Sequence, residues 1–197
     1  MRDNVSYRRT TLSLLWAALV AWPMAGTAQI AIPVDTCDYI TSEGKFNTTA
    51  NRTHRLARAN FTFIGGCKNG SLNLGNLNYT DQGNGLRLTA TNITAYIWAG
   101  NGGLNPDRPI GTRIVCGTAK TNIFGKVNFR VVVHDAGKTG IDDVFMIRLR
   151  NKNGKTVYTT ENPQEDFTLG GAGSGGGNIQ IHKQTGGSFG GSCPAFF

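Results

Sequence analysis

The sequence lacks several short motifs that mark common catalytic sites. It contains no HExxH zinc helix and no GxxxxGK[ST] phosphate loop. Acidic residues are also scarce, with 12 Asp and Glu against 20 Lys and Arg. Most acids stand beside Gly, Pro or Asn in apparent turns, where Asp bonds the local backbone. A hydrolase needs a nucleophile beside a base or two carboxylates across a cleft, so we predict that the protein is not an enzyme and rank a hydrolase last.

Metal-binding patterns are similarly sparse. No two of the four cysteines have CxxC spacing, and the three histidines, His54, His134 and His182, are far apart in the sequence. This argues against a zinc site. No cofactor is expected, with one exception: the segment between Val133 and Val144 contains three aspartates that could supply the oxygen ligands preferred by calcium. These calcium candidates are Asp135, Asp142 and Asp143. The alternative is a Gly-rich turn whose aspartates cap the backbone.

Long apolar runs are confined to the start of the chain. Arginines at 2, 8 and 9 precede an apolar stretch, and small residues at 26–28 offer a cleavage site. The stretch at 12–24 is shorter than the roughly 20 residues of a membrane-spanning helix. We therefore predict a signal peptide at 1–28, and a secreted, periplasmic or cell-surface location after its cleavage. No transmembrane segment is expected after cleavage.

The rest of the chain is long enough for one domain with a core, predicted at 29–183, followed by a Gly-rich tail at 184–197. Loss of the leader lowers the formal charge from +8 to +6. The basic residues are dispersed, apart from a cluster of Arg52, His54, Arg55 and Arg58. We expect no nucleic-acid partner for an exported chain, and either a solvated surface or contact with an acidic polysaccharide or anionic lipid for this cluster.

Four cysteines in an exported chain predict disulfides, with three possible pairings. Cys37 opens the chain after the leader and Cys193 nearly ends it. Because domain termini often lie close together, we favour Cys37 with Cys193 and Cys67 with Cys116.

Period-two alternation predicts the fold class. Apolar residues alternate with polar ones at 127–133 and 145–149, which is typical of half-buried strands. Similar runs occur at 60–64, 72–79, 86–98, 112–118, 155–160 and 178–183. Turn sequences such as 81–85 separate them, and no convincing helical periodicity follows the leader. We predict an all-β, antiparallel β-sandwich of jelly-roll or Greek-key type.

The run at 86–98 breaks its own alternation. Leu86 and Leu88 share one face, whereas Ile93 and Ile97 fall on the other. A β-bulge near Asn92, or two separate strands, would return both sets to the core. The run ends on Trp98, which either covers one end of the core or stacks on a sugar ring.

Five segments, read in order, resemble the post-COAP domain, a module of secreted bacterial proteins. They lie at 59–63, 68–70, 76–81, 129–148 and 175–183, the last being a Gly-rich approach to Ile-Gln-Ile-His-Lys. The resemblance covers about residues 36–183 and implies a β-rich extracellular module. The family has no established activity, so the resemblance implies no site residue.

These inferences favour a secreted, non-catalytic module that binds a polysaccharide or a cell-surface protein, with Trp98 and Arg55 as ligand-binding candidates. After the predicted leader, six Asn-x-Ser/Thr sequences are expected to place polar residues on outward strand faces, because residues i and i+2 share a face. A structural or assembly role is the alternative. The tail bears on it: 186–191 is expected to be flexible, and the apolar end at 195–197 is either a partner signal or is docked through Cys193.

Overall fold

The computed structural model describes residues 37–50, 55–68, 71–100, 107–137, 140–162, 167–170, 175–183, 186–194 and 196–197. The predicted leader, Arg52, His54 and tail residues 184, 185 and 195 lie outside this part. The described residues form ten strands: β1 (Tyr39–Thr48), β2 (Ala57–Lys68), β3 (Ser71–Asp81), β4 (Leu86–Trp98), β5 (Gly111–Thr121), β6 (Gly125–Asp135), β7 (Val144–Arg150), β8 (Thr156–Thr159), β9 (Gly176–His182) and β10 (Gly190–Gly191). The all-β prediction is confirmed.

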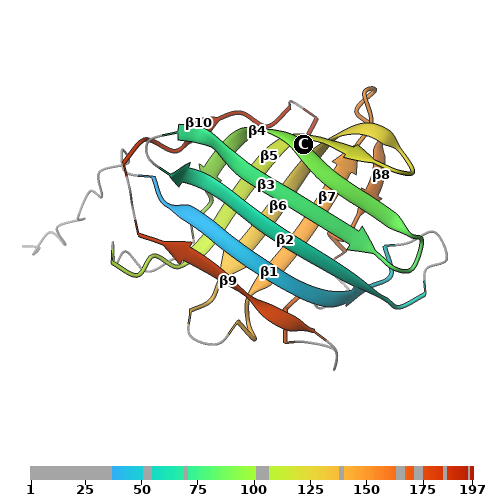
Figure 1. Cartoon of the computed structure of the whole chain (residues 1–197), viewed down its shortest axis with the longest axis horizontal. Coiled ribbons are helices and arrows are strands. Elements are labelled where there is room, and N and C mark those ends of the chain that lie inside the picture. The colour runs from blue at the N-terminus through green and yellow to red at the C-terminus, as the bar shows by residue number, and fades with distance from the viewer. Residues whose placement is uncertain are drawn as a thin grey trace, which may run out of the picture. The chain divides into compact units, whose positions relative to one another are not determined.

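All described strands belong to one antiparallel sheet, in the order β8-β7-β6-β5-β4-β3-β2-β1-β9 (Figure 1). The sequence predicted the two sheets of a sandwich, and the described strands instead form a single curled sheet. The reason lies in the connections: successive strands from β1 to β8 pair as neighbours, so none leaves for a second sheet. The last two strands return to earlier ones, since β9 pairs with β1 and the short β10 pairs with β4.

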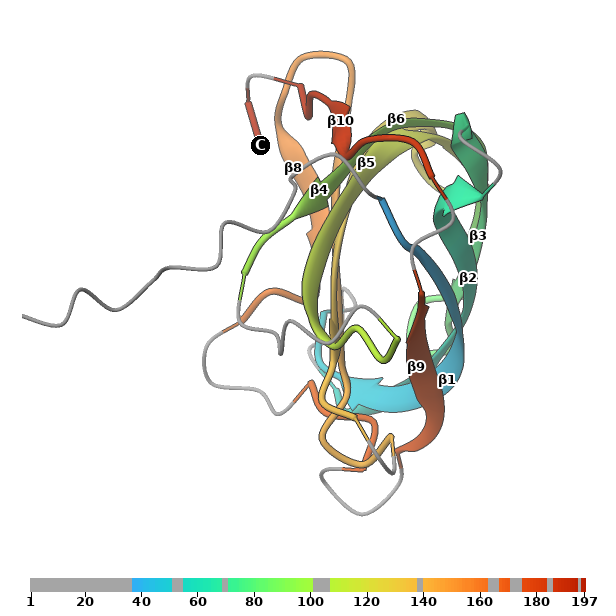
Figure 2. The same cartoon turned by 90° about the vertical axis from the view of Figure 1, so that its left-hand side faces the viewer.

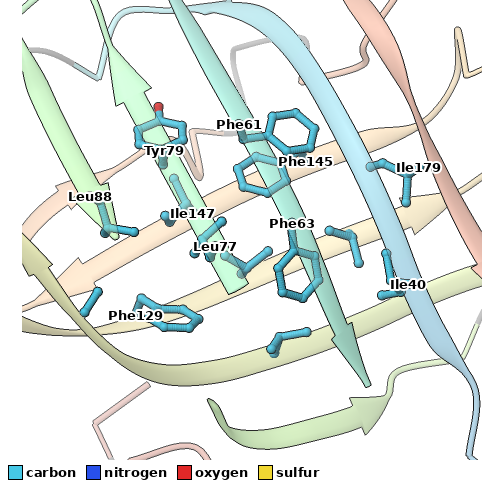
Figure 3. Close-up of a cluster of buried hydrophobic side chains, with 14 of the residues drawn as sticks. Ile40, Phe61, Phe63, Leu77, Tyr79, Leu88, Phe129, Phe145, Ile147 and Ile179 are labelled. Carbon is cyan, nitrogen blue, oxygen red and sulfur yellow. The ribbon is translucent and has the colours of Figure 1, made fainter. Parts of the chain in front are cut away.

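The sheet curls until its two halves pack against each other. Figure 2 shows β1, β2, β3 and β9 facing β4 and β5 across the interior. The rings of Phe61 on β2 and Phe145 on β7 stack with centroids 3.8 Å apart (Figure 3). Phe46 and Tyr79 lie against Phe145 with centroids 6.0 and 6.2 Å away. One sheet thus forms both walls of the core.

Glycines opposite aromatic residues accompany this curl. Gly44 pairs with Phe61 across β1 and β2, and a Cβ at Gly44 would lie 2.8 Å from the Phe61 ring. Gly117 pairs with Phe129 across β5 and β6, and its Cβ would lie 2.7 Å from that ring. In each pair the ring occupies the space of the missing side chain, a device that lets sheets bend without leaving a void.

Strand β4 contains two irregularities in register, one between Ala90 and Asn92 and one between Ile93 and Ala95. The bulge expected near Asn92 is confirmed, and Ile93 is buried as predicted. The second irregularity was not expected. It reverses the alternation again, so Tyr96 enters the core and Ile97 is only partly buried.

Both disulfides form, but the predicted pairing is wrong. Cys37 is bonded to Cys67 and Cys116 to Cys193. Cys37 comes just before β1 and Cys67 lies near the end of β2. Because Tyr39 pairs with Gly66, the β1–β2 hairpin itself brings the first two cysteines together.

The C-terminal tail is docked along most of its described length. The N–H of Cys37 donates to the carbonyl of Gly187, 2.9 Å away, so the chain ends do approach each other. Phe189 stacks on Tyr96 with centroids 5.5 Å apart. Strand β10 then pairs with β4, and Cys193 closes on β5. The expectation of a tail held by Cys193 is confirmed.

Within the described residues, no helix has the length and apolar character needed to span a bilayer.

Candidate functional site

The face of the sheet directed away from the core, here called the outer face, carries a row of polar side chains across six neighbouring strands. The register places its members directly opposite one another: Glu43, Thr62, Asn78, Thr89, Lys120 and Lys126. All six are exposed. The hydroxyl of Thr89 donates to the side-chain oxygen of Asn78, 3.1 Å away. We call this set the polar row.

A shorter second row runs beside the polar row, and each of its members lies two residues from a member of the polar row on the same strand. Its members are Lys45, Asn60, Thr80 and Arg87. This arrangement confirms that the Asn-x-Thr sequences at 60–62 and 78–80 place polar side chains on outward strand faces. Successive members of a row are separated by the distance between strands, about 4.8 Å.

A shallow depression of about 470 Å³ lies where the two rows begin. Glu43, Lys45, Asn60 and Thr62 line it, together with the backbone around Gly44 and the glycines at 175–177, where β9 begins. Gly176 stands opposite Lys45 in the β1–β9 register, so this side of the depression has no side chain. The result is an open polar trough rather than an enclosed pocket.

The side chains of the two rows can form hydrogen bonds with a ligand. Hydroxyl and amide side chains can both donate and accept, which suits the hydroxyl groups of a sugar. Because the rows run across the strands, a ligand lying along them would meet a similar polar group at each strand.

The calcium candidates are divided by the fold. Asp135 and Asp143 are buried and Asp142 is exposed. Asp135 accepts hydrogen bonds from the N–H groups of Gly137 (2.8 Å) and Ile181 (2.8 Å). The described residues contain no group of three or more His, Cys, Asp or Glu side chains arranged to hold a metal.

Asp143 follows the same pattern as Asp135. It accepts hydrogen bonds from the N–H groups of Ala136 (2.9 Å) and Ile179 (2.7 Å). Ile179 and Ile181 belong to β9, which is an edge strand. The two carboxylates therefore serve the free N–H groups of that edge and tie it to the β6–β7 connection. Burial raises the pKa of Asp135, although its two N–H partners act in the opposite direction.

The two ligand-binding candidates lie at opposite ends of the sheet. Trp98 is 48% exposed and pairs with Arg113 at the start of β5. Arg55 is exposed just before β2, at the end where Thr48 pairs with Ala57. The structure does not bring them together, so they do not form one site.

A buried polar network joins the two halves of the sheet near the β3–β4 turn. The hydroxyl of Tyr158 donates to Asp81, 3.0 Å away, and Tyr79 and Tyr158 hydroxyls are 2.6 Å apart. Asp81 also accepts from the N–H of Gly83 at 2.7 Å, as expected of a turn aspartate. Burial raises the pKa of Asp81 and raises that of Tyr158 far above its ordinary value.

A second buried network lies at the opposite end of the core, and the sequence analysis missed it. Asp38 accepts from both the Nε and Nη2 groups of Arg113, at 3.1 and 2.5 Å, and from the hydroxyl of Tyr96 at 2.6 Å. Burial, together with the charge of Asp38, raises the pKa of Tyr96, so its hydroxyl remains a donor. The guanidinium of Arg113 lies 5.5 Å from the centroid of the Phe189 ring. No local sequence signal joins these residues.

The histidines that stand beside charged residues make simple contacts. His134 shares a hydrogen bond of 2.9 Å with the hydroxyl of Thr112. His182 shares one of 2.6 Å with Thr41 and stacks on Tyr39.

One segment, 186–190, has the Gly-x-Ser-x-Gly spacing of a hydrolase nucleophile turn. That turn joins a strand to a helix. Here the segment bends at 186–187 and leads into β10, so the helical context of the motif is missing.

Comparison with known proteins identifies no relative: no family model matches the chain, and no curated protein or solved structure is detectably similar to it.

Proposed function

We propose that the chain is an exported, non-catalytic module of post-COAP type that binds an extracellular polysaccharide along the polar row. The observation that carries this proposal is the unbroken alignment of Thr62, Asn78 and Thr89 across three strands. The distance between strands is comparable to the length of one sugar residue in an extended chain. A linear glycan across the strands would therefore meet one hydrogen-bonding side chain per sugar.

Two further features support an exported, non-catalytic module. Both disulfides suit an oxidising compartment. Four of the aspartates are used as internal hydrogen-bond acceptors, which leaves them unavailable as a pair of catalytic acids. They are Asp38, Asp81, Asp135 and Asp143.

The test compares two double variants on an array of extracellular polysaccharides probed with the oxidised protein. N78A/T89A removes one amide and one hydroxyl from the polar row. N153A/T156A removes the same groups from the exposed β7–β8 region. We expect binding to one polymer class that N78A/T89A weakens and N153A/T156A leaves unchanged. Equal binding by both variants would place the site elsewhere, and no binding by the unmodified protein would refute the proposal.

A second candidate function is assembly with a cell-surface protein. It is favoured by the exposed apolar side chains of Ile64 and Trp98, which are 52% and 48% exposed. Such side chains are typical anchors in protein interfaces. Substituting both with Ser and measuring cell-surface attachment distinguishes the two functions, because the polar row contains neither residue.

A further inference from the structure

The fold hides acidic side chains and displays basic ones. Four aspartates are buried, and Glu161 is partly buried against two arginines. Among the described residues the exposed acids are Glu43, Asp107 and Asp142. The exposed basic residues are Lys45, Arg55, Arg58, Arg87, Arg108, Lys120, Lys126, Lys152, Lys155 and Lys183. On the described surface, exposed basic side chains therefore outnumber exposed acidic ones by ten to three.

Two of these basic residues face each other at the end of the polar row. Lys120 on β5 and Lys126 on β6 are a direct cross-strand pair, and both are exposed. Like charges directly opposite each other destabilise a sheet. Neither lysine takes part in an ion pair with any described residue. The presence of two facing lysines is therefore not explained by a contribution to the stability of the sheet.

The same sheet contains a like-charged pair that is neutralised. Arg130 on β6 and Arg148 on β7 are also directly opposite each other. The carboxylate of Glu161 contacts both guanidinium groups, that of Arg130 at 3.5 Å. Lys120 and Lys126 have no such shared carboxylate among the described residues.

A third cation extends the group. Arg87 stands two residues before Thr89, the partner of Lys120, and so is a diagonal neighbour of Lys120 at about 7 to 8 Å between Cα atoms. Glu43, the one acid of the polar row, is four strands from Lys120, or about 19 Å along the sheet. At physiological salt this exceeds the screening length of about 8 Å. Glu43 therefore does not neutralise the cluster.

We propose that Lys120, Lys126 and Arg87 bind the carboxylate, sulfate or phosphate groups of an acidic polysaccharide whose sugar hydroxyls lie along the polar row. This inference rests on the proposed function and adds the chemical class of the ligand. The cluster continues the row without a break, because Lys120 is the cross-strand partner of Thr89. A single glycan chain can therefore contact both the cations and the neutral hydrogen-bonding groups.

The test measures binding of the oxidised protein to acidic polymers (polygalacturonate, alginate and dextran sulfate) and neutral polymers (dextran, mannan and β-glucan). Phosphatidylglycerol vesicles and duplex DNA are measured in parallel. The variant K120Q/K126Q removes the facing cations. The control R108Q/K183Q removes the same charge from exposed positions outside the row. We expect one acidic polymer to bind, K120Q/K126Q to weaken it by about tenfold or more, and the control to weaken it by less than about threefold.

Each other outcome overturns a defined part of the proposal. Binding of neutral polymers alone refutes the acidic ligand and leaves the proposed function standing. Equal weakening by both variants refutes the location, because it shows an effect of total charge. Tighter binding of vesicles or DNA than of every acidic polymer refutes the ligand class. No binding to any polysaccharide refutes the proposed function as well.

Discussion

The carboxylate of Asp143 accepts a hydrogen bond from the backbone N–H of Ile179, 2.7 Å away, and so connects the β6–β7 region to the edge strand β9. Unpaired edge strands invite pairing with other chains. Here side-chain carboxylates, rather than another strand, accept the hydrogen bonds of the N–H groups of Ile179 and Ile181 on this edge. Two of the three aspartates that suggested a cation site in the sequence, Asp135 and Asp143, have this structural use.

We predict that D143A lowers the free energy of unfolding by about 2 to 3 kcal/mol, because it leaves the N–H groups of Ile179 and Ala136 without their acceptor. D142A, at the exposed neighbouring position, should change it by less than about 0.5 kcal/mol. Urea titration of both variants checks this. Equal effects would show that the link to β9 contributes little.

Calcium at millimolar concentration should leave the melting temperature unchanged. Each of the four carboxylate oxygens of Asp135 and Asp143 already accepts an N–H group, so a cation would compete with these hydrogen bonds for the same oxygens. Thermal melting with and without calcium provides the measurement. A saturable rise in melting temperature that D142N abolishes would establish a calcium site instead.

The stability of the protein should respond to the titration of Asp81. Its pKa is raised by burial, so this group contributes stability below its ordinary pKa, about 3.9. That contribution is lost as the pH rises through the raised value. D81N cannot ionise. Its free energy of unfolding, relative to that of the unmodified protein, should therefore increase as the pH rises from the ordinary pKa of an Asp through the raised pKa of Asp81. A difference independent of pH would contradict the shift.

Proteolytic mapping without reduction should recover the fragments containing Cys37 and Cys67 as one linked pair, and those containing Cys116 and Cys193 as the other. Closing loops of 30 and 77 residues restricts the unfolded chain by about 3 to 5 kcal/mol each. C116A/C193A should accordingly lower the free energy of unfolding by about 2 to 4 kcal/mol. Recovery of a Cys37–Cys193 fragment would refute this connectivity.

The buried pair of Asp38 and Arg113 should be strongly coupled. Each is at most 3% exposed, so D38A or R113A leaves an uncompensated buried charge and should cost about 3 to 5 kcal/mol. The double variant D38A/R113A should cost clearly less than the sum of the two. A double-mutant cycle from denaturant titrations measures this coupling. Additive effects would mean that the pair is not a unit.

The sequence by itself determined the local structure of most of this chain. Alternation at 127–133 and 145–149 predicted β6 and β7. Turn sequences such as 81–85 predicted where one strand ends and the next begins. The broken alternation at 86–98 predicted either a bulge or two separate strands, and β4 contains the bulge. These features depend on which face each side chain takes, which is a property of neighbouring residues.

Strand β1 was not predicted, and the reason is physical. Its inward positions are Ile40, Ser42, Gly44, Phe46 and Thr48. Three of these five are polar or lack a side chain, so no apolar alternation is visible. Gly44 fits the core only because the ring of Phe61, on the next strand, lies over it.

Tertiary structure alone decided the features that connect distant residues. The cysteine pairing depends on the register of β1 with β2, and the Asp38–Arg113 pair depends on how the ends of β1 and β5 approach within the curled sheet. The polar row likewise exists only because five successive registers align single residues from six strands. Composition and periodicity describe each strand, but cross-strand register arises from the packing of the whole sheet.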